Sequence, residues 1–161
     1  MNSALATARV PELRQRVVEF VSAASTEITP HDEFLVPTLA AALPIGAAVY
    51  VAHTPKSTLN DVVRVSIDLQ RRGLTASPHI VARRLESEKM LREALGRLRA
   101  GGINQILVIA GDRKSPMGPF ASTLDIIDSG LLAEAGFPRV GFAGHPQGHP
   151  RSEERRVGKE C

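Results

Sequence analysis

The sequence predicts an α/β fold built around a sheet of parallel strands. Five short runs of apolar residues alternate along the chain with stretches in which apolar residues recur at helical spacing. The strand-like runs are apolar throughout, as is typical of parallel strands that are buried in a sheet. Amphipathic helices between such strands are expected to cover the outer side of the sheet.

The first 52 residues are expected to form two helices and two strands. Pro11 is suited to the first turn of a helix, and the apolar residues that follow it have helical spacing. Pro37 starts a second, short helix, and a Pro-Ile-Gly turn then leads into an apolar strand. The expected ranges are 10–19 for the first helix, 21–28 for the first strand, 37–43 for the second helix and 47–52 for the second strand.

Three further helix–strand units are expected after residue 56. Ser57 or Thr58, Ser87 and Ser122 each precede an amphipathic stretch and can cap a helix. Glycines end these stretches, as is common at the carboxyl ends of helices. The strands that follow the three helices are expected at 75–81, 105–110 and 139–144.

Polar residues at the ends of the strands favour one of two possible architectures. A doubly wound open sheet and a (βα)8 TIM barrel both fit the alternating pattern. No Gly-x-Gly-x-x-Gly turn follows any strand, which weakens the doubly wound alternative. A barrel gathers its chemistry at the carboxyl ends of its strands. Polar residues lie at or just beyond those ends, namely Glu27, His53, His79, Asp112 and His145.

The expected barrel is truncated after about the fifth strand. Five strands in residues 1–150 are fewer than the eight that a complete barrel of about 250 residues contains. The last eleven residues, RSEERRVGKEC at 151–161, lack any helical or strand period and resemble the translation of a sequencing adapter. A charged, disordered tail is the alternative. We therefore expect 1–150 to be the first part of a barrel and 151–161 to be non-native. An incomplete barrel would expose strand edges and be poorly soluble.

Composition excludes several classes of function. The formal net charge is +3 with basic residues scattered along the chain, and aromatic residues make up 4% of it, so a nucleic-acid surface is not expected. No apolar run is long enough for a membrane span, and no secretory signal begins the chain, so a cytoplasmic location is the default. Cys161 is the only cysteine, which leaves no thiolate metal site or disulfide in residues 1–150.

Two carboxylates are candidates for chemistry. Glu27 lies among apolar residues, and at a barrel mouth its carboxyl would lose water and be able to act as a general acid. A glutamate that simply bridges or caps at the surface is the alternative. Asp112 ends a buried strand in a glycine-containing turn, where an aspartate can also be only a turn residue.

The histidines do not predict a metal site. His145 and His149 are four residues apart, but the prolines between and after them prevent a regular helix from presenting both rings on one face. His53 and His79 taken singly are explained as polar residues at strand ends. The glycine-containing segment 111–118 lacks the Gly-Lys-Ser/Thr ending of a phosphate loop, so no nucleotide-triphosphate site is expected.

Five short motifs, taken in order and spacing, resemble the methylenetetrahydrofolate reductase family over residues 20–150. They are STEITP at 25–30, SPH at 77–79, IAGD at 109–112, GPFAS at 118–122 and HPQGHP at 145–150. The resemblance implies a flavin-binding barrel that transfers hydride from NADH or NADPH to FAD and then to 5,10-methylenetetrahydrofolate, giving 5-methyltetrahydrofolate. In such enzymes the flavin supplies the chemistry and the protein orients the reactants.

The resemblance also implies roles for individual residues. Glu27 matches the family's catalytic acid, and Asp112 matches the aspartate beside flavin and folate, where charge develops. The remaining matched positions line FAD in the family, namely His53, His79, Gly111, Ala121, His145 and His149. The implied partner is a small folate substrate, with a homo-oligomer possible for the full-length protein.

The chain departs from the family's pattern at four positions. Ala110 replaces a common arginine, Ala52 a frequent threonine, His145 a tyrosine and Gln147 a glutamate. These differences indicate a divergent branch and leave open the nicotinamide donor and the folate specificity. Two other functions stay open, a related flavin barrel that acts on a non-folate substrate and a small interaction domain without enzymatic activity. Later strands of the family carry further binding residues, so the 161-residue chain is expected to be inactive.

Overall fold

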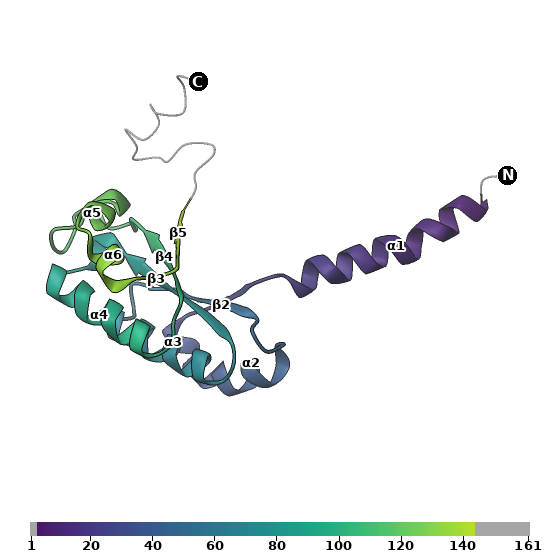
Figure 1. Ribbon diagram of the computed structural model, residues 1–161, viewed down its shortest axis with the longest axis horizontal. Helices are drawn as coiled ribbons and strands as arrows, with labels where there is room; N and C mark the ends of the chain where they lie inside the picture. The colour runs from purple at the N-terminus through teal and green to yellow at the C-terminus, as the bar shows by residue number, and fades with distance from the viewer. Residues whose placement is uncertain (1–2, 144–161) are drawn as a thin grey trace, which may run out of the picture.

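The computed structural model describes residues 3–143 and has an α/β fold (Figure 1). Its five strands form one sheet in the order β1-β2-β3-β4-β5, and every neighbouring pair is parallel. The strands are β1 (Thr26–Ile28), β2 (Ala48–Val51), β3 (Thr75–Val81), β4 (Gln105–Ile109) and β5 (Arg139–Phe142). The α-helices are α1 (Ser3–Ser22), α2 (Val36–Ala42), α3 (Leu59–Arg71), α4 (Glu88–Ala100), α5 (Thr123–Asp128) and α6 (Leu131–Ala135), with 3₁₀ turns η1 (Pro30–Leu35) and η2 (Ala82–Arg84).

The strand order follows the chain without a reversal. Each strand is hydrogen-bonded to the strand before and after it in the sequence. A doubly wound sheet instead reverses its strand order at a switch point. The prediction of a parallel α/β fold is confirmed, and the sheet of residues 26–142 is compatible with part of a barrel.

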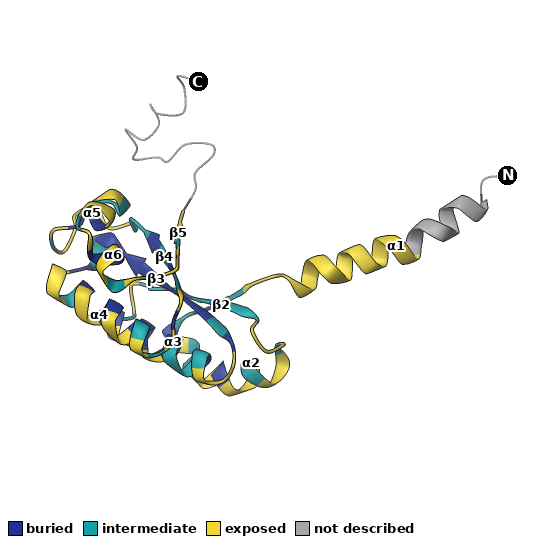
Figure 2. Cartoon of the chain, viewed as in Figure 1, coloured by how far each residue is buried: buried dark blue, intermediate teal, exposed yellow. Residues whose placement is uncertain are grey.

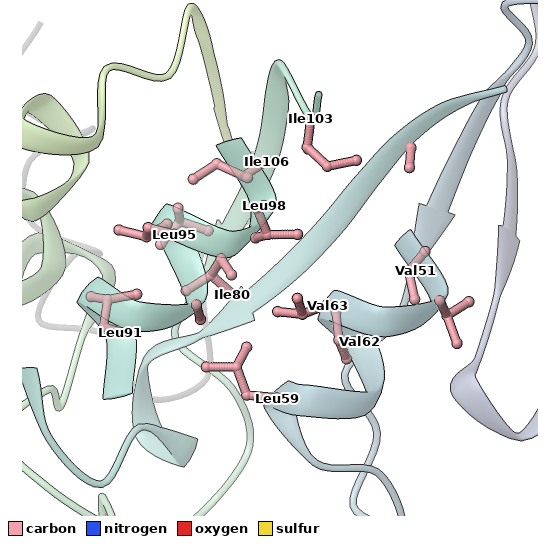
Figure 3. Packing of buried hydrophobic residues seen from close by; sticks show 14 of the residues in the cluster. Val51, Leu59, Val62, Val63, Ile80, Leu91, Leu95, Leu98, Ile103 and Ile106 are labelled. Carbon is pink, nitrogen blue, oxygen red and sulfur yellow. The ribbon is translucent and has the colours of Figure 1, made fainter. Parts of the chain in front are cut away.

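The core lies between the sheet and the helices α3 and α4 (Figure 3). Thr58 and Ser87 cap these two helices, because their hydroxyl oxygens accept hydrogen bonds from the backbone N–H groups of Asp61 and Met90. Burying one leucine, isoleucine or valine side chain contributes about 1.5–3 kcal/mol. The helices present their buried side chains to Ile80 and Ile106 of the sheet, and these helical residues include Leu59, Val62, Val63, Leu91, Leu95 and Leu98.

The two faces of the sheet differ in burial. Along β2 and β4, fully or nearly fully buried residues alternate with residues that are only partly buried. Val49 and Val51 pack toward the helices, whereas Tyr50 between them is half-buried on the opposite face. The opposite face therefore carries the more accessible side chains of the sheet.

Strand β3 changes its ladder partner halfway along its length. Residues Thr75 to Pro78 are in register with β2, and residues His79 to Val81 are in register with β4. Pro78 has no backbone N–H to donate at the point of this change. The side chain of His79 thus lies where β3 leaves β2 for β4.

The predicted start and end of the first helix are wrong. Helix α1 covers 3–22 and contains Pro11 within it, so the strand expected from residue 21 begins only at Thr26. Strand β1 is an edge strand paired with three residues of β2, which limits its length. Residues 11–22 of α1 are exposed and α1 extends away from the sheet (Figures 1 and 2).

The single helix expected after Ser122 is two helices. Gly130 has a φ of +73°, a left-handed conformation that interrupts the helix between α5 and α6. Leu124 and Ile127, which were expected on the inner face, are 57% and 40% exposed, whereas Ile126 is the residue of α5 that is buried. The range of β3 agrees with the sequence prediction, as do the cap at Ser87 and the glycine that ends α4. No helix within residues 3–143 has both the length and the apolar character needed to cross a membrane.

Candidate functional site

The candidate site lies on the accessible face of the sheet, at the carboxyl ends of β1 to β4. Register places Glu27 beside Tyr50 and Tyr50 beside Ser77, so these three side chains share one face. His79 is two residues beyond Ser77 on the same face of β3. The sheet geometry therefore brings together a carboxylate, a phenol and an imidazole from three successive strands.

The carboxylate of Glu27 and the imidazole of His79 lie close together on this face. Glu27 Oε2 lies 3.5 Å from His79 Nε2, and the edge of the Tyr50 ring packs against the imidazole at 5.9 Å between centroids. The side chain of His79 is only 11% exposed, whereas that of Glu27 is 57% exposed. The desolvation of Glu27 expected from the sequence is thus not found, because the described residues leave its carboxyl in contact with water.

Two histidines near the strand ends are neutral at pH 7. Burial lowers the pKa of His79, and the negative charge of Glu27 only partly opposes this effect. Burial, together with the positive charge of Arg84, lowers the pKa of His53 to about 4. The buried atoms Nε2 of His79 and Nδ1 of His53 have no hydrogen-bond partner among the described residues. Both rings therefore present buried polar atoms that a ligand can satisfy.

Asp112 lies in an exposed loop that follows β4. Gly111 before it has a φ of +88°, and a Cβ at this position would lie 2.4 Å from Cγ1 of Val81. Any side chain at residue 111 would therefore clash with β3. The glycine is needed to turn the chain tightly beside the neighbouring strand, so that the aspartate follows directly at the sheet edge.

Arg83 holds this loop against the end of β3. Its backbone N–H donates to the carbonyl oxygen of Ala110 at 3.0 Å, and its own carbonyl accepts from Met117 at 3.1 Å. Its guanidinium Nη1 donates to the carbonyl oxygens of Arg113 and Lys114, at 3.2 and 3.1 Å. One residue thus fixes both ends and the middle of the segment that carries Asp112.

Ala121 begins the return of the loop into α5. Its backbone N–H donates to Oδ2 of Asp125 at 2.6 Å, and that of Ser122 donates to the same oxygen at 2.8 Å. Ser122 in turn caps the helix by accepting from the backbone N–H of Asp125. Ala121 is half-buried, so its small side chain lies at the edge of the loop without blocking it.

The structure assembles some of the predicted residues and leaves others apart. Glu27 and His79 are in contact, and His53 is close enough to His79 to be affected by its charge. Asp112, Gly111 and Ala121 lie in the neighbouring loop after β4. His145 and His149 are outside the described residues.

Sequence reasoning missed three residues of this region. Tyr50 packs against His79, Arg83 organises the loop after β4, and the guanidinium of Arg84 donates to the carbonyl oxygen of Thr54. The available signal was a pair of consecutive arginines one residue after a buried strand, since charged residues at that end of a parallel strand often serve the site. Tyr50 carried no such signal, because an aromatic residue in an apolar run is usually core.

A cavity of about 210 Å³ lies beside this edge of the sheet. It is bordered by the segments that follow β1 and β2 and by the start of α3. Arg64 on its wall is paired with Asp61 at 3.0 Å and with Glu33. The lining also contains Pro30, His31, Lys56 and Ser57. Among residues 3–143, no three histidine, aspartate or glutamate side chains are gathered in a way that could hold a metal ion.

These features are those of a polar site placed at the carboxyl edge of a parallel sheet. No protein-family model matches this chain.

Proposed function

We propose that residues 1–150 form the first part of the (βα)8 barrel of an FAD-dependent methylenetetrahydrofolate reductase. The enzyme would reduce 5,10-methylenetetrahydrofolate to 5-methyltetrahydrofolate with NADH or NADPH as donor. One observation carries the proposal: Glu27, His53, His79 and the Asp112 loop all lie at one edge of the sheet. Glu27, His79 and Asp112 belong to three of the five sequence motifs, and His53 is a position to which the resemblance assigns contact with FAD.

The two histidines support a flavin as the cofactor. An isoalloxazine ring is uncharged when oxidised, and its ring nitrogens and carbonyl oxygens form hydrogen bonds. His53 and His79 are neutral at pH 7 and keep buried nitrogen atoms without partners among the described residues. A neutral imidazole that needs a hydrogen bond suits such a ring better than it suits an anion. His53, His79, Gly111 and Ala121 would therefore border FAD, which supplies hydride transfer when it is bound.

The two carboxylates are assigned to the substrate side of the site. Glu27 would donate a proton as the five-membered ring of the folate opens, which leaves an iminium carbon able to accept hydride. Its carboxyl is the one acidic group on the accessible face of β1. Asp112 would lie beside the cationic centre that forms, where a negative charge stabilises it. Arg83 would act indirectly by holding the Asp112 loop.

The test begins with the source gene, read independently past codon 150. We expect the reading frame to continue with further strand–helix units, and the protein that it encodes to be yellow with bound FAD. That protein should oxidise NADH or NADPH only when methylenetetrahydrofolate is present. A frame that ends after Cys161 would overturn the proposal. A flavoprotein that does not reduce the folate would instead be a barrel for another substrate.

A further inference from the structure

The contact between Glu27 and His79 spans an intervening strand. Both β1 and β3 are hydrogen-bonded to β2, so their backbones are about 9–10 Å apart. Glu27 is in register with Tyr50, and its side chain must pass over that residue to reach the imidazole. Nevertheless, Oε2 lies 3.5 Å from Nε2. The pair therefore depends on an extended glutamate that aims at one nitrogen atom.

Of the two side chains, the imidazole is fixed and the carboxyl is movable. His79 is buried, its ring packs against Tyr50, and its backbone lies in the ladder with Leu107 of β4. Glu27 is more than half exposed and has no other ion pair within the described part of the chain. The buried Nε2 of His79 lacks a hydrogen-bond partner, so the movable carboxyl of Glu27 takes its position from this fixed atom.

The charges around His79 decide which nitrogen carries its proton. The titratable groups that face the ring are Glu27 from β1, Tyr50 from β2 and His53 from the segment after β2, while β4 contributes the apolar Leu107. Glu27 is the one anion among them. A neutral imidazole with its proton on Nδ1 would turn a lone pair toward this carboxylate. The carboxylate therefore favours the tautomer in which Nε2 carries the proton.

We infer that His79 is a positioning residue for Glu27, whose carboxyl it holds over the sheet face through Nε2–H. When Glu27 is ionised, Nε2–H donates to Oε2; when Glu27 is protonated, its O–H donates to Nε2 of the other tautomer. One proton thus stays between the two groups in either state. The inference rests on the proposed function for the role of Glu27. Because Nε2 of His79 is assigned to the acid, His79 would border the cofactor through its ring alone, and Nδ1 of His53 is the unpartnered histidine nitrogen of the described residues that is left for a hydrogen bond to FAD.

The experiment is a pH titration by nuclear magnetic resonance of the 161-residue chain, labelled with ¹³C and ¹⁵N. Glu27→Gln removes the charge and leaves the shape, so it should shift the His79 titration to lower pH. Glu86→Gln is the matched control, because it neutralises an exposed carboxylate after the same strand, and Glu86 is not among the charges that shift the pKa of His79. In the unmodified chain, the ¹⁵N shifts at neutral pH should show the proton on Nε2. Equal titrations in the two variants, or a proton on Nδ1, would overturn the inference.

A second variant, His79→Gln, tests the same interaction by observing Glu27 instead of His79. In the unmodified chain, the Cδ resonance of Glu27 should respond as His79 titrates, and in His79→Gln this response should vanish. The introduced amide keeps an N–H donor near the position of Nε2, which limits the structural change. A response that persists in His79→Gln would also overturn the inference. These measurements need neither flavin nor folate. If Glu27 and His79 affect each other's titration as expected but the reductase assay fails, only the proposed function is overturned.

Discussion

Gly118 packs directly on the backbone of Glu86: a Cβ at residue 118 would lie 2.3 Å from the Glu86 carbonyl oxygen. The contact joins the loop after β4 to the segment that leads into α4. Because the obstructing atom belongs to the backbone, it cannot rotate away as the end of a side chain can. The loop that carries Asp112 is therefore seated by a close approach that only glycine permits.

Replacing Gly118 by alanine should destabilise the protein by more than about 1 kcal/mol, since loop and backbone must separate to admit the methyl group. Gly96→Ala is the matched control, because a Cβ there meets nothing within 4 Å and the residue lies inside α4. That change should stabilise the helix by about 0.5–1 kcal/mol. Urea unfolding of the two variants measures both effects, and equal destabilisation would contradict the packing described for Gly118.

Leu95 tests the interface between α4 and the sheet. Its side chain is 1% exposed and lies in the cluster that joins the helices to β3 and β4. Leu95→Ala should lower the free energy of unfolding by about 2–5 kcal/mol, because the change leaves a cavity. Phe20→Ala on α1 removes a larger side chain that is 80% exposed, and it should change stability by less than about 0.5 kcal/mol. Similar losses for both variants would show that α1 also packs in solution.

His53 should make the protein less stable as the pH falls. Its pKa is lowered to about 4 in the folded state and returns to about 6.5 on unfolding. The unfolded chain therefore binds more protons between these values, so stability is complete above pH 6.5 and declines toward pH 4. The loss should be on the order of 2–3 kcal/mol. Unfolding measured from pH 4 to 7 should show a shallower slope for His53→Gln.

The exposed His31 provides the control for this slope, because His31→Gln also removes a histidine but no buried ring. If the two variants have the same pH dependence, His53 is not the group that causes it.

Ser87 should stabilise α4 through its cap. The Ser87 hydroxyl accepts from the backbone N–H of Met90 at 3.2 Å. Ser87→Ala leaves that N–H without its partner and should cost about 1 kcal/mol. Ser87→Asp keeps an oxygen in place and adds a negative charge at the helix start, so it should retain the stability. Thermal unfolding followed by circular dichroism compares the three proteins, and an equal loss in both variants would exclude capping as the cause.

Glu27→Gln should abolish folate reduction in the protein that the source gene encodes. Removing a general acid typically lowers the rate by about 10²–10⁴-fold. FAD should remain bound, since glutamine has the size of glutamate and residue 27 is exposed. Stopped-flow measurement of flavin reoxidation by methylenetetrahydrofolate separates hydride transfer to the folate from the reduction of FAD by NADH or NADPH. Unchanged turnover would remove Glu27 from the mechanism, and Glu86→Gln should behave like the unmodified protein.

Local sequence signals predicted the middle of the fold well. Ser87 and the glycine after α4 gave the bounds of that helix, because caps act within a few residues. The parallel sheet followed from apolar runs separated by amphipathic stretches. The predicted bounds were wrong where contacts between elements determine them. Strand β1 is an example, because its length depends on the three residues of β2 with which it pairs. The break at Gly130 was also not predicted, because a single residue in the left-handed conformation divides a stretch with helical periodicity into two helices.

The candidate site was predictable in position but not in its contacts. Strand ends located Glu27, His79 and Asp112 near one edge, as parallel topology requires. The pairing of Glu27 with His79 depends on a side chain that crosses β2, and no spacing in the sequence encodes that reach. The same holds for Arg83, whose partners lie 30 and 31 residues away in the chain.

The change of partner along β3 has a mechanical consequence. The residues of β3 that pair with β2 end at Pro78, and those that pair with β4 begin at His79. In this register, no residue of β3 is paired with both β2 and β4. The two halves of the sheet are therefore joined by the continuous backbone of β3 and by the core that α3 and α4 form with both halves, and not by a shared ladder residue.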